Sequence, residues 1–309
     1  MPSVGALLCL ASAVAFGAMA IFGKLAYDEG STVGTLLAVR FVLAAALFWV
    51  LVAGTGAARQ LRTISRRDLG IALALGAVGY SAQAGAYFAA LQRLDASLLS
   101  LLLYTFPAMV TVAAIALGRE RANRRTAGAL LLASAGLFLV LAGAGAGALD
   151  PLGTFLGISA AVVYSTYILV SAGVSQRVGP LVLSALVCTG AATTLTLAGV
   201  IEGDMHLGDV SAAGFGWLAA IAVVSTVGAV SLFFAGLQRV GPTTASILST
   251  VEPVTTVLLA FLVFGESLGP VQLAGGALVV GAVLVLSAPA GVRHPPTTVP
   301  HDVPSQASQ

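Results

Sequence analysis

Glu252 and Arg40 are ionisable side chains that lie inside long apolar stretches of the sequence. A charge at the middle of a bilayer is destabilising, so such a residue marks either a functional site or a structural pair. Three roles stay open for Glu252: a proton-coupling group, a ligand for a cationic or amino group, or a structural partner of a buried donor such as Arg40.

Arg40 lies about a third of the way along the apolar stretch 33–53, and Lys24 lies at the end of the first apolar stretch. Arg40 could neutralise a carboxylate, whether that of a substrate or that of Glu252. For Lys24 the simpler interpretation is a side chain that extends to the membrane–water interface.

Tyrosines and polar side chains recur at spacings that place them on one face of a helix. Tyr80, Gln83 and Tyr87 are three and four residues apart, and Tyr164 and Tyr167 are three apart. Around a cavity, such side chains would give hydrogen bonds and aromatic surface to a small organic substrate. The alternative is hydrogen bonding between packed helices together with interfacial tyrosines. Three further candidates for the cavity are Tyr104, Thr105 and Thr250.

Two prolines, Pro107 and Pro253, fall inside apolar stretches at matching places in the two halves of the chain. Each removes a backbone donor and frees a carbonyl one turn earlier. A membrane tolerates such a defect only beside protein or a water-filled cavity. The two prolines therefore predict kinks in a pair of helices that line a central cavity; the alternative is a kink that serves only packing, since prolines are common in membrane helices.

The sequence lacks the motifs of the main enzyme classes. It has no phosphate-binding Gly-Lys-Ser/Thr loop, no nucleophile elbow of the G-x-S-x-G type and no H-E-x-x-H pair. Its three histidines lie in a loop or near the C-terminus. We therefore predict no catalytic residue, no metal site and no cofactor, and the net charge of +2 gives no reason to expect a nucleic-acid partner.

The composition is that of an integral membrane protein. Of 309 residues 58% are hydrophobic and 8% are charged, whereas soluble domains have about 25% charged residues. A bilayer core requires about 20 mostly apolar residues per helix. On this basis we predict an all-α protein with ten transmembrane helices near 4–26, 33–53, 69–91, 96–117, 126–144, 152–173, 180–200, 213–237, 243–263 and 269–288.

The arginines predict the orientation. Two loops are rich in arginine, 59–67 and 119–125, whereas the loop after the seventh predicted helix is acidic. With both termini in the cytoplasm, eleven of the fourteen basic residues fall on the cytoplasmic side, as topology rules require. The proline-rich segment 289–309 is predicted to be a disordered cytoplasmic tail.

Residues 232–266 repeat residues 86–120. One constant offset places Leu91, Gln92 and Arg93 on Leu237, Gln238 and Arg239, and it also places Pro107 on Pro253 and Glu120 on Glu266. With five helices in each half, the second half must enter the membrane from the opposite face. We therefore predict two inverted repeats, 1–148 and 149–288, an arrangement typical of secondary transporters.

The chain resembles the EamA-like transporters of the drug/metabolite transporter superfamily. The resemblance is densest over 235–286, in A-G-L-Q-R-V-G-P-T-T-A-S, V-E-P and F-G-E-S-L-G-P, and it continues in the first half at Arg40–Phe41 and Gly118–Glu120. It implies ten helices in two inverted repeats, a central cavity and alternating access without ATP. Because the family commonly has Glu before the second-half proline, Glu252 is evidence of membership more than of a coupling ion.

The predicted function is export of a small polar metabolite, such as an amino acid, across the inner or plasma membrane. The expected partners are this substrate, the lipid bilayer and protons as a coupling ion, with a homodimer as a further alternative. Uptake or drug efflux by the same fold is one competing function. A non-transporting membrane scaffold or an intramembrane enzyme is another.

Overall fold

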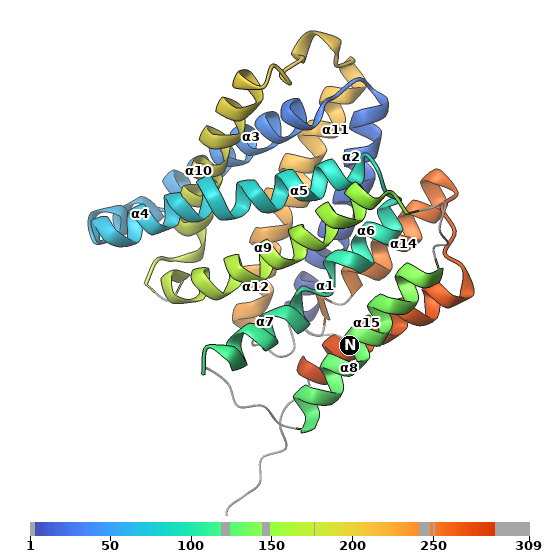
Figure 1. Cartoon of the computed structure of the whole chain (residues 1–309). Helices are drawn as coiled ribbons and strands as arrows, with labels where there is room; N and C mark the ends of the chain where they lie inside the picture. Colours follow the sequence, from blue (N-terminus) through green and yellow to red (C-terminus); the bar gives the residue numbers. More distant parts are fainter. Residues whose placement is uncertain are drawn as a thin grey trace, which may run out of the picture.

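A computed structural model places the chain in a bundle of helices (Figure 1), and it describes residues 4–118, 124–143, 149–175, 177–240, 248–249 and 251–287. The residues described contain helices and turns and no strand. The first-half helices are α1 (Val4–Gly17), α2 (Met19–Asp28), α3 (Val33–Gly54), α4 (Arg66–Ala74), α5 (Ser81–Leu91), α6 (Ala96–Leu103), α7 (Phe106–Ala116) and α8 (Arg124–Gly143). The second-half helices are α9 (Pro151–Ser175), α10 (Pro180–Ile201), α11 (Ala212–Ala222), α12 (Ala229–Val240), α14 (Val251–Phe264) and α15 (Pro270–Ser287).

Within the described ranges, seven helical segments are long and apolar enough to cross a membrane. They are Val4–Asp28, Val33–Gly54, Arg66–Leu91, Ala96–Ala113, Pro151–Ser171, Pro180–Ile201 and Ala212–Leu237. Three shorter apolar helices, Ala127–Gly143, Val251–Phe264 and Pro270–Val285, lie at the places of the predicted fifth, ninth and tenth spans. The all-helical class is confirmed, and length and composition support seven of the ten predicted spans. The predicted tail, 289–309, lies outside the described residues.

Two of the long segments contain a π-helical stretch, which the sequence analysis did not predict. η2 (Leu75–Tyr80) lies between α4 and α5, and η4 (Val223–Gly228) lies between α11 and α12. In each, a hydroxyl donates to the carbonyl five residues earlier: Ser81 to Gly76 at 3.0 Å and Thr226 to Ile221 at 2.9 Å. Ser81 and Thr226 are one residue away from the register of the sequence repeat. The same widened turn thus occurs in both halves, and such turns are frequent at functional sites.

The two halves pack against each other along their whole length. α3 packs on α10, α8 on α15 and α6 on α14, while α1 packs on α12 and α5 on α9. The pairs α3–α10 and α8–α15 join helices at equivalent places in the repeat, whereas α14 occupies the place that corresponds to α7. In the other two pairs, α1 corresponds to α9 and α12 corresponds to α5, so the repeat converts the α1–α12 pair into the α9–α5 pair. The side-by-side course of α8 with α15 is visible in Figure 1.

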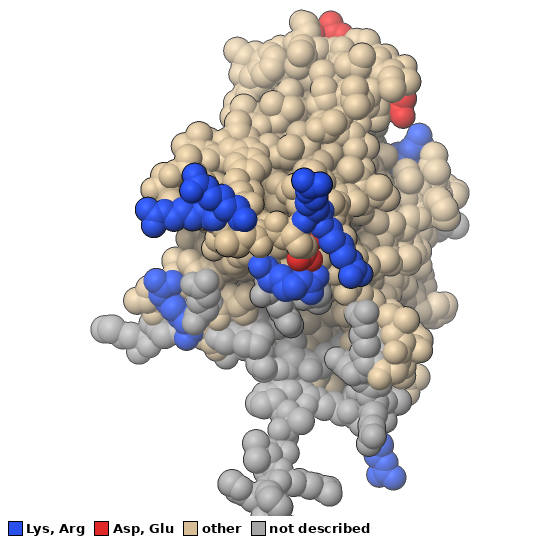
Figure 2. Space-filling model, turned by 90° about the vertical axis from the view of Figure 1, so that its left-hand side faces the viewer, with Lys and Arg blue, Asp and Glu red and all other residues tan. Residues whose placement is uncertain are grey.

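Opposite charges gather at the two ends of the bundle. Figure 2 shows arginines at the end where α3 finishes and α4 begins. Arg177, in the α9–α10 loop, donates two hydrogen bonds to Asp68 at 2.7 and 3.0 Å and so joins this loop to α4. At the other end acidic side chains make the contacts. There the carboxylate of Asp204 accepts from the backbone N–H of Gly34 at 2.7 Å, and Asp150 pairs with Arg93 at 3.5 Å.

Candidate functional site

A row of aromatic rings passes through the bundle from the end of η2 to the break between α6 and α7. Tyr80 packs on Tyr167 with 5.7 Å between ring centroids, and Tyr167 stacks on Tyr164 at 6.3 Å. Tyr164 then meets the edge of Phe106 at 4.6 Å, and Phe106 meets Tyr104 at 5.7 Å. We call these five residues the aromatic row. It brings together four of the tyrosines predicted from the sequence, from three separate segments of the chain.

Glu252 lies in the first turn of α14, half-buried. Its carboxylate is close enough to interact electrostatically with the hydroxyls of Tyr80, Tyr87, Tyr104 and Tyr164. Four tyrosine hydroxyls therefore lie within electrostatic range of one carboxyl group. Phenol hydroxyls and ring faces are groups that hold a cation beside a carboxylate.

Arg40 is 2% exposed and is held by hydroxyls and rings instead of by a carboxylate. Its Nε donates to Thr226 Oγ1 at 3.0 Å and its Nη2 donates to the Tyr80 hydroxyl at 3.4 Å. The guanidinium also lies 5.4 Å from the ring centre of Phe88 and 4.8 Å from that of Phe41. Thr226 belongs to η4 and Tyr80 to η2, so Arg40 joins the two π-helical stretches.

The pairing of Arg40 with Glu252, one alternative from the sequence, is not formed: no ion pair joins these two described residues. The physical reason is that Arg40 already has acceptors in Thr226 and Tyr80. Tyr80 and Tyr87 interact electrostatically with both charges. Arg40 and Glu252 therefore lie near a common pair of tyrosines without pairing with each other.

The other candidates from the sequence have different surroundings. Gln83 is 7% exposed and lies on α5 between Tyr80 and Tyr87. The hydroxyl of Thr105 donates to the Leu102 carbonyl at 2.7 Å, and Thr105 lines a separate groove of about 390 Å³ between α7, α8 and α9. Thr250 lies outside the described residues.

Both prolines lie at the start of a helix. Pro107 is the second residue of α7 and follows a break at Tyr104 and Thr105, which ends α6. Pro253 is the third residue of α14 and is buried. The hydroxyl of Tyr104 donates to the carbonyl of Ser249, just before α14. The break between α6 and α7 thus lies against the residues just before α14, beside the aromatic row.

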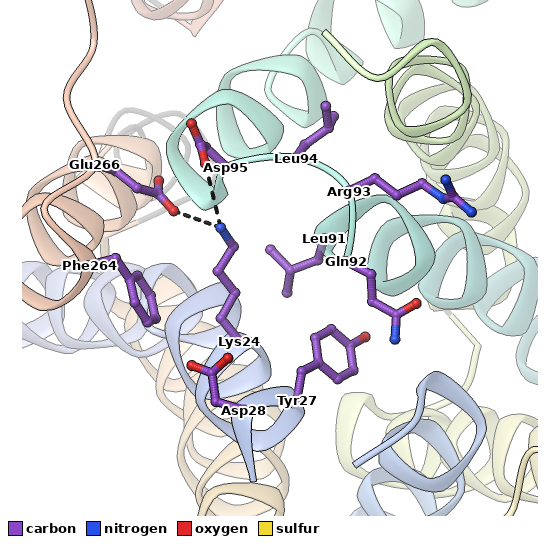
Figure 3. A pocket seen from close by; sticks show the side chains of 10 residues that line it. All are labelled: Lys24, Tyr27, Asp28, Leu91, Gln92, Arg93, Leu94, Asp95, Phe264 and Glu266. Carbon is purple, nitrogen blue, oxygen red and sulfur yellow. Dashed lines mark hydrogen bonds and ion pairs between the residues drawn. The ribbon is translucent and has the colours of Figure 1, made fainter. Parts of the chain in front are cut away.

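The simpler interpretation expected Lys24 to extend to the membrane–water interface; in the structure its side chain instead has ion-pair partners. Its Nζ lies 2.8 Å from a carboxylate oxygen of Glu266 and 3.8 Å from one of Asp95. Burial alone would raise the pKa of Glu266, but hydrogen bonds from Lys24 and from the backbone N–H of Ser97 and Ala96 outweigh it and keep that pKa below its ordinary value. Lys24 is therefore an ion-pair partner at the mouth of the bundle, which Figure 3 shows.

Sequence reasoning missed Phe106 and Thr226. Phe106 lies at the place in the first half that corresponds to Glu252 in the second, and its ring joins Tyr104 to Tyr164. Thr226 carries a signal that could have been found, since it is a hydroxyl residue almost in repeat register with Ser81. The sequence does not show that these two hydroxyl residues belong to π-helical turns, so their shared role could not be inferred from it.

Comparison with known proteins agrees with this architecture. The model of the EamA-like transporter family matches residues 3–142 and 151–288, one match in each half. The chain belongs to the EamA-like transporter family. It is therefore a multi-pass membrane protein whose family consists of transporters, and the resemblance found in its motifs is confirmed.

Two relatives have the word transporter in their names. The uncharacterized transporter YcbK of Bacillus subtilis (strain 168) is 27% identical over 288 residues, which cover 88% of this chain and 89% of the relative. An uncharacterized transporter of Archaeoglobus fulgidus is 29% identical over 199 residues, which cover 64% of this chain and 70% of the relative. A solved structure titled only "Crystal structure of protein" is similar with a TM-score of 0.67 at 19% identity, over 93% of this chain and 97% of the other. This last likeness concerns the fold alone.

Proposed function

We propose that the protein is a secondary-active transporter that exports a small polar metabolite, such as an amino acid, by alternating access. The observation that carries the proposal is the placement of Arg40 and Glu252 around shared tyrosines near the broken ends of α6 and α14. Opposite charges that do not neutralise each other are suited to a ligand that itself has two opposite charges.

The tyrosines determine how such a ligand would lie. The oxygen of Tyr80 accepts a hydrogen bond from Arg40, so its own proton is left to be donated elsewhere. A substrate carboxylate would take that proton on the side of Arg40. Its ammonium group would lie near Glu252, among the ring faces of Tyr104 and Tyr164.

The proposed mechanism moves one half of the bundle against the other. We infer ten helices in two inverted repeats, which the two family matches, the exchange of packing pairs and the paired π-helical stretches support. Helices broken at the binding site are the usual place for such motion. The arginine-rich end would face the cytoplasm, together with both termini, in the inner or plasma membrane.

Transport by purified protein in liposomes tests the proposal. Radiolabelled amino acids are followed in Glu252→Gln, Gln83→Ala and Tyr164→Phe, with Glu202→Gln as the matched control, since Glu202 is exposed at the end of α10. We expect flux in the parent and in the control, and at least a tenfold loss in Glu252→Gln. Unchanged flux in all three site variants would refute the assignment of these residues to the substrate site. No flux for any compound would favour the membrane scaffold.

A further inference from the structure

Glu266 follows α14 and holds three helices together at one mouth of the bundle. One carboxylate oxygen accepts from Lys24 Nζ of α2 at 2.8 Å and from the N–H of Ala96 at 3.1 Å. The other accepts from the N–H and the hydroxyl of Ser97, at 3.0 and 2.9 Å. A carboxylate at the start of a helix is stabilised by the free N–H groups of the first turn. Glu266 thus caps α6 and binds Lys24 at the same time.

Burial distinguishes this contact from an ordinary surface ion pair. The side chain of Glu266 is 7% exposed and that of Lys24 is 21% exposed, whereas Arg93 and Asp150 nearby are 45% and 36% exposed. Exposed ion pairs contribute little to stability, while breaking a shielded pair leaves a charge without a partner. A third pair at this mouth, Lys24–Asp95 at 3.8 Å, has an acidic side chain that is 69% exposed, so Lys24–Glu266 is the most shielded of the three.

A water-accessible pocket ends at this ion pair. It has a volume of about 730 Å³ and is lined by residues of α2, α5, the α5–α6 connection and the segment after α14 (Figure 3). Behind the ion pair, every residue of α6 is buried, including Ser100. The Lys24–Glu266 contact therefore forms one side of the pocket and adjoins the buried helix α6.

α6 connects this ion pair to the candidate site. Its first turn is held by Glu266, and the residue after its last, Tyr104, donates to the Ser249 carbonyl. α14 runs beside it, with Glu252 in its first turn and Glu266 just past its end. The same two helices are thus fastened to each other at the mouth and at the site. A separation of α6 from α14 at the mouth would therefore also shift Tyr104 and Glu252.

We propose that Lys24 and Glu266 form the gate of this mouth and that the gate opens when Glu266 leaves the first turn of α6. This inference rests on the proposed alternating access, but it names the contact that must break. Opening exposes the N–H groups of Ala96 and Ser97 to water, which replaces the carboxylate. Water then enters along α6 towards Tyr104.

Cysteine accessibility tests the gate without any transport assay. The two native cysteines are replaced, as Cys9→Ala and Cys188→Ala, and Ser100→Cys is introduced as the reporter on α6. A membrane-impermeant maleimide is applied to intact cells and, separately, to inside-out vesicles. We expect slow labelling in the parent from the side of Lys24. Lys24→Gln and Glu266→Gln should label at least tenfold faster from that side only.

Three further variants make the result specific. Arg93→Gln removes an equal charge from the same pocket and should label like the parent. Ser97→Ala removes one hydrogen bond to Glu266 and should accelerate labelling about threefold, even where the stronger variants do not reach the membrane. Exchange of the two charges, Lys24→Glu with Glu266→Lys, restores an ion pair but no acceptor for α6, so labelling should stay fast.

Labelling at the parent rate in membrane-inserted Lys24→Gln, Glu266→Gln and Ser97→Ala would overturn the gate. This outcome is distinguishable from failure of the proposed function. Glu252→Gln should abolish transport and label like the parent. Transport that is lost in Glu252→Gln, with labelling unaffected in every gate variant, would refute the gate alone.

Discussion

Replacing Thr226 by valine should destabilise the protein through Arg40. Thr226 is 1% exposed, accepts from Arg40 Nε at 3.0 Å and donates to the Ile221 carbonyl at 2.9 Å. Valine has nearly the same shape but no hydroxyl, so the buried guanidinium loses an acceptor that water does not replace. A hydrogen bond to a charged group contributes about 1.5–3 kcal/mol. Neutral hydrogen bonds between membrane helices contribute only about 0.6 kcal/mol on average.

We therefore expect Thr226→Val to lower the free energy of unfolding by about 2–3 kcal/mol. Thr226→Ser keeps the hydroxyl and loses one methyl group, which should cost about 1 kcal/mol. Thr193→Val is the matched control. Its hydroxyl bonds the Thr189 carbonyl at 2.9 Å on an exposed face of α10, and its loss should change stability by less than about 0.5 kcal/mol.

Unfolding by SDS in mixed micelles, followed by tryptophan fluorescence, measures the three variants under one condition. The reasoning predicts the order Thr193→Val, Thr226→Ser, Thr226→Val from most to least stable. A loss of about 0.6 kcal/mol or less in Thr226→Val would refute it. Thr226 would then be an ordinary neutral contact, and Arg40 would not depend on it.

Two further predictions concern packing and pH. In Gly76→Ala the new methyl would lie 1.9 Å from the Val187 carbonyl oxygen, so SDS unfolding should show a loss of about 3 kcal/mol, whereas Gly70→Ala, with open space, should be neutral or slightly stabilising. The pKa of Glu266 is lowered in the folded protein, so its contribution is present above its unfolded pKa of about 4.3 and disappears as the pH falls through the folded value. Melting curves of the parent and Glu266→Gln should keep their difference from pH 7 down to about pH 4.3 and converge only below it, as the pH falls through the lowered folded pKa; a constant difference there would contradict this.

The helical class and the polar faces were predictable because they depend on local patterns. Apolar length alone separates a spanning helix from a loop. Spacings of three and four residues placed Tyr80, Gln83 and Tyr87 on one face, and the structure has them on α5 or its first boundary. The family was predictable as well, since its motifs lie in a fixed order.

The contacts that determine the site were not predictable, because they join residues far apart in the sequence. Lys24 and Glu266 are separated by 242 residues, and Arg40 and Thr226 by 186. No periodicity connects such pairs, and only the packing of the two halves brings them together. The π-helical stretches were also hidden, since one hydroxyl–carbonyl bond five residues apart leaves no trace in the apolar pattern.

Ligand-dependent unfolding tests the central claim, that Arg40 and Glu252 together bind the substrate. Purified parent and Glu252→Gln are heated in detergent with a panel of amino acids, nucleosides, sugars and cationic drugs. A ligand at 100 times its dissociation constant adds about 2.7 kcal/mol of stability. We predict that amino acids stabilise the parent and that Glu252→Gln loses most of this gain. Equal stabilisation of both proteins, or amino acids without effect on the parent, would contradict the account.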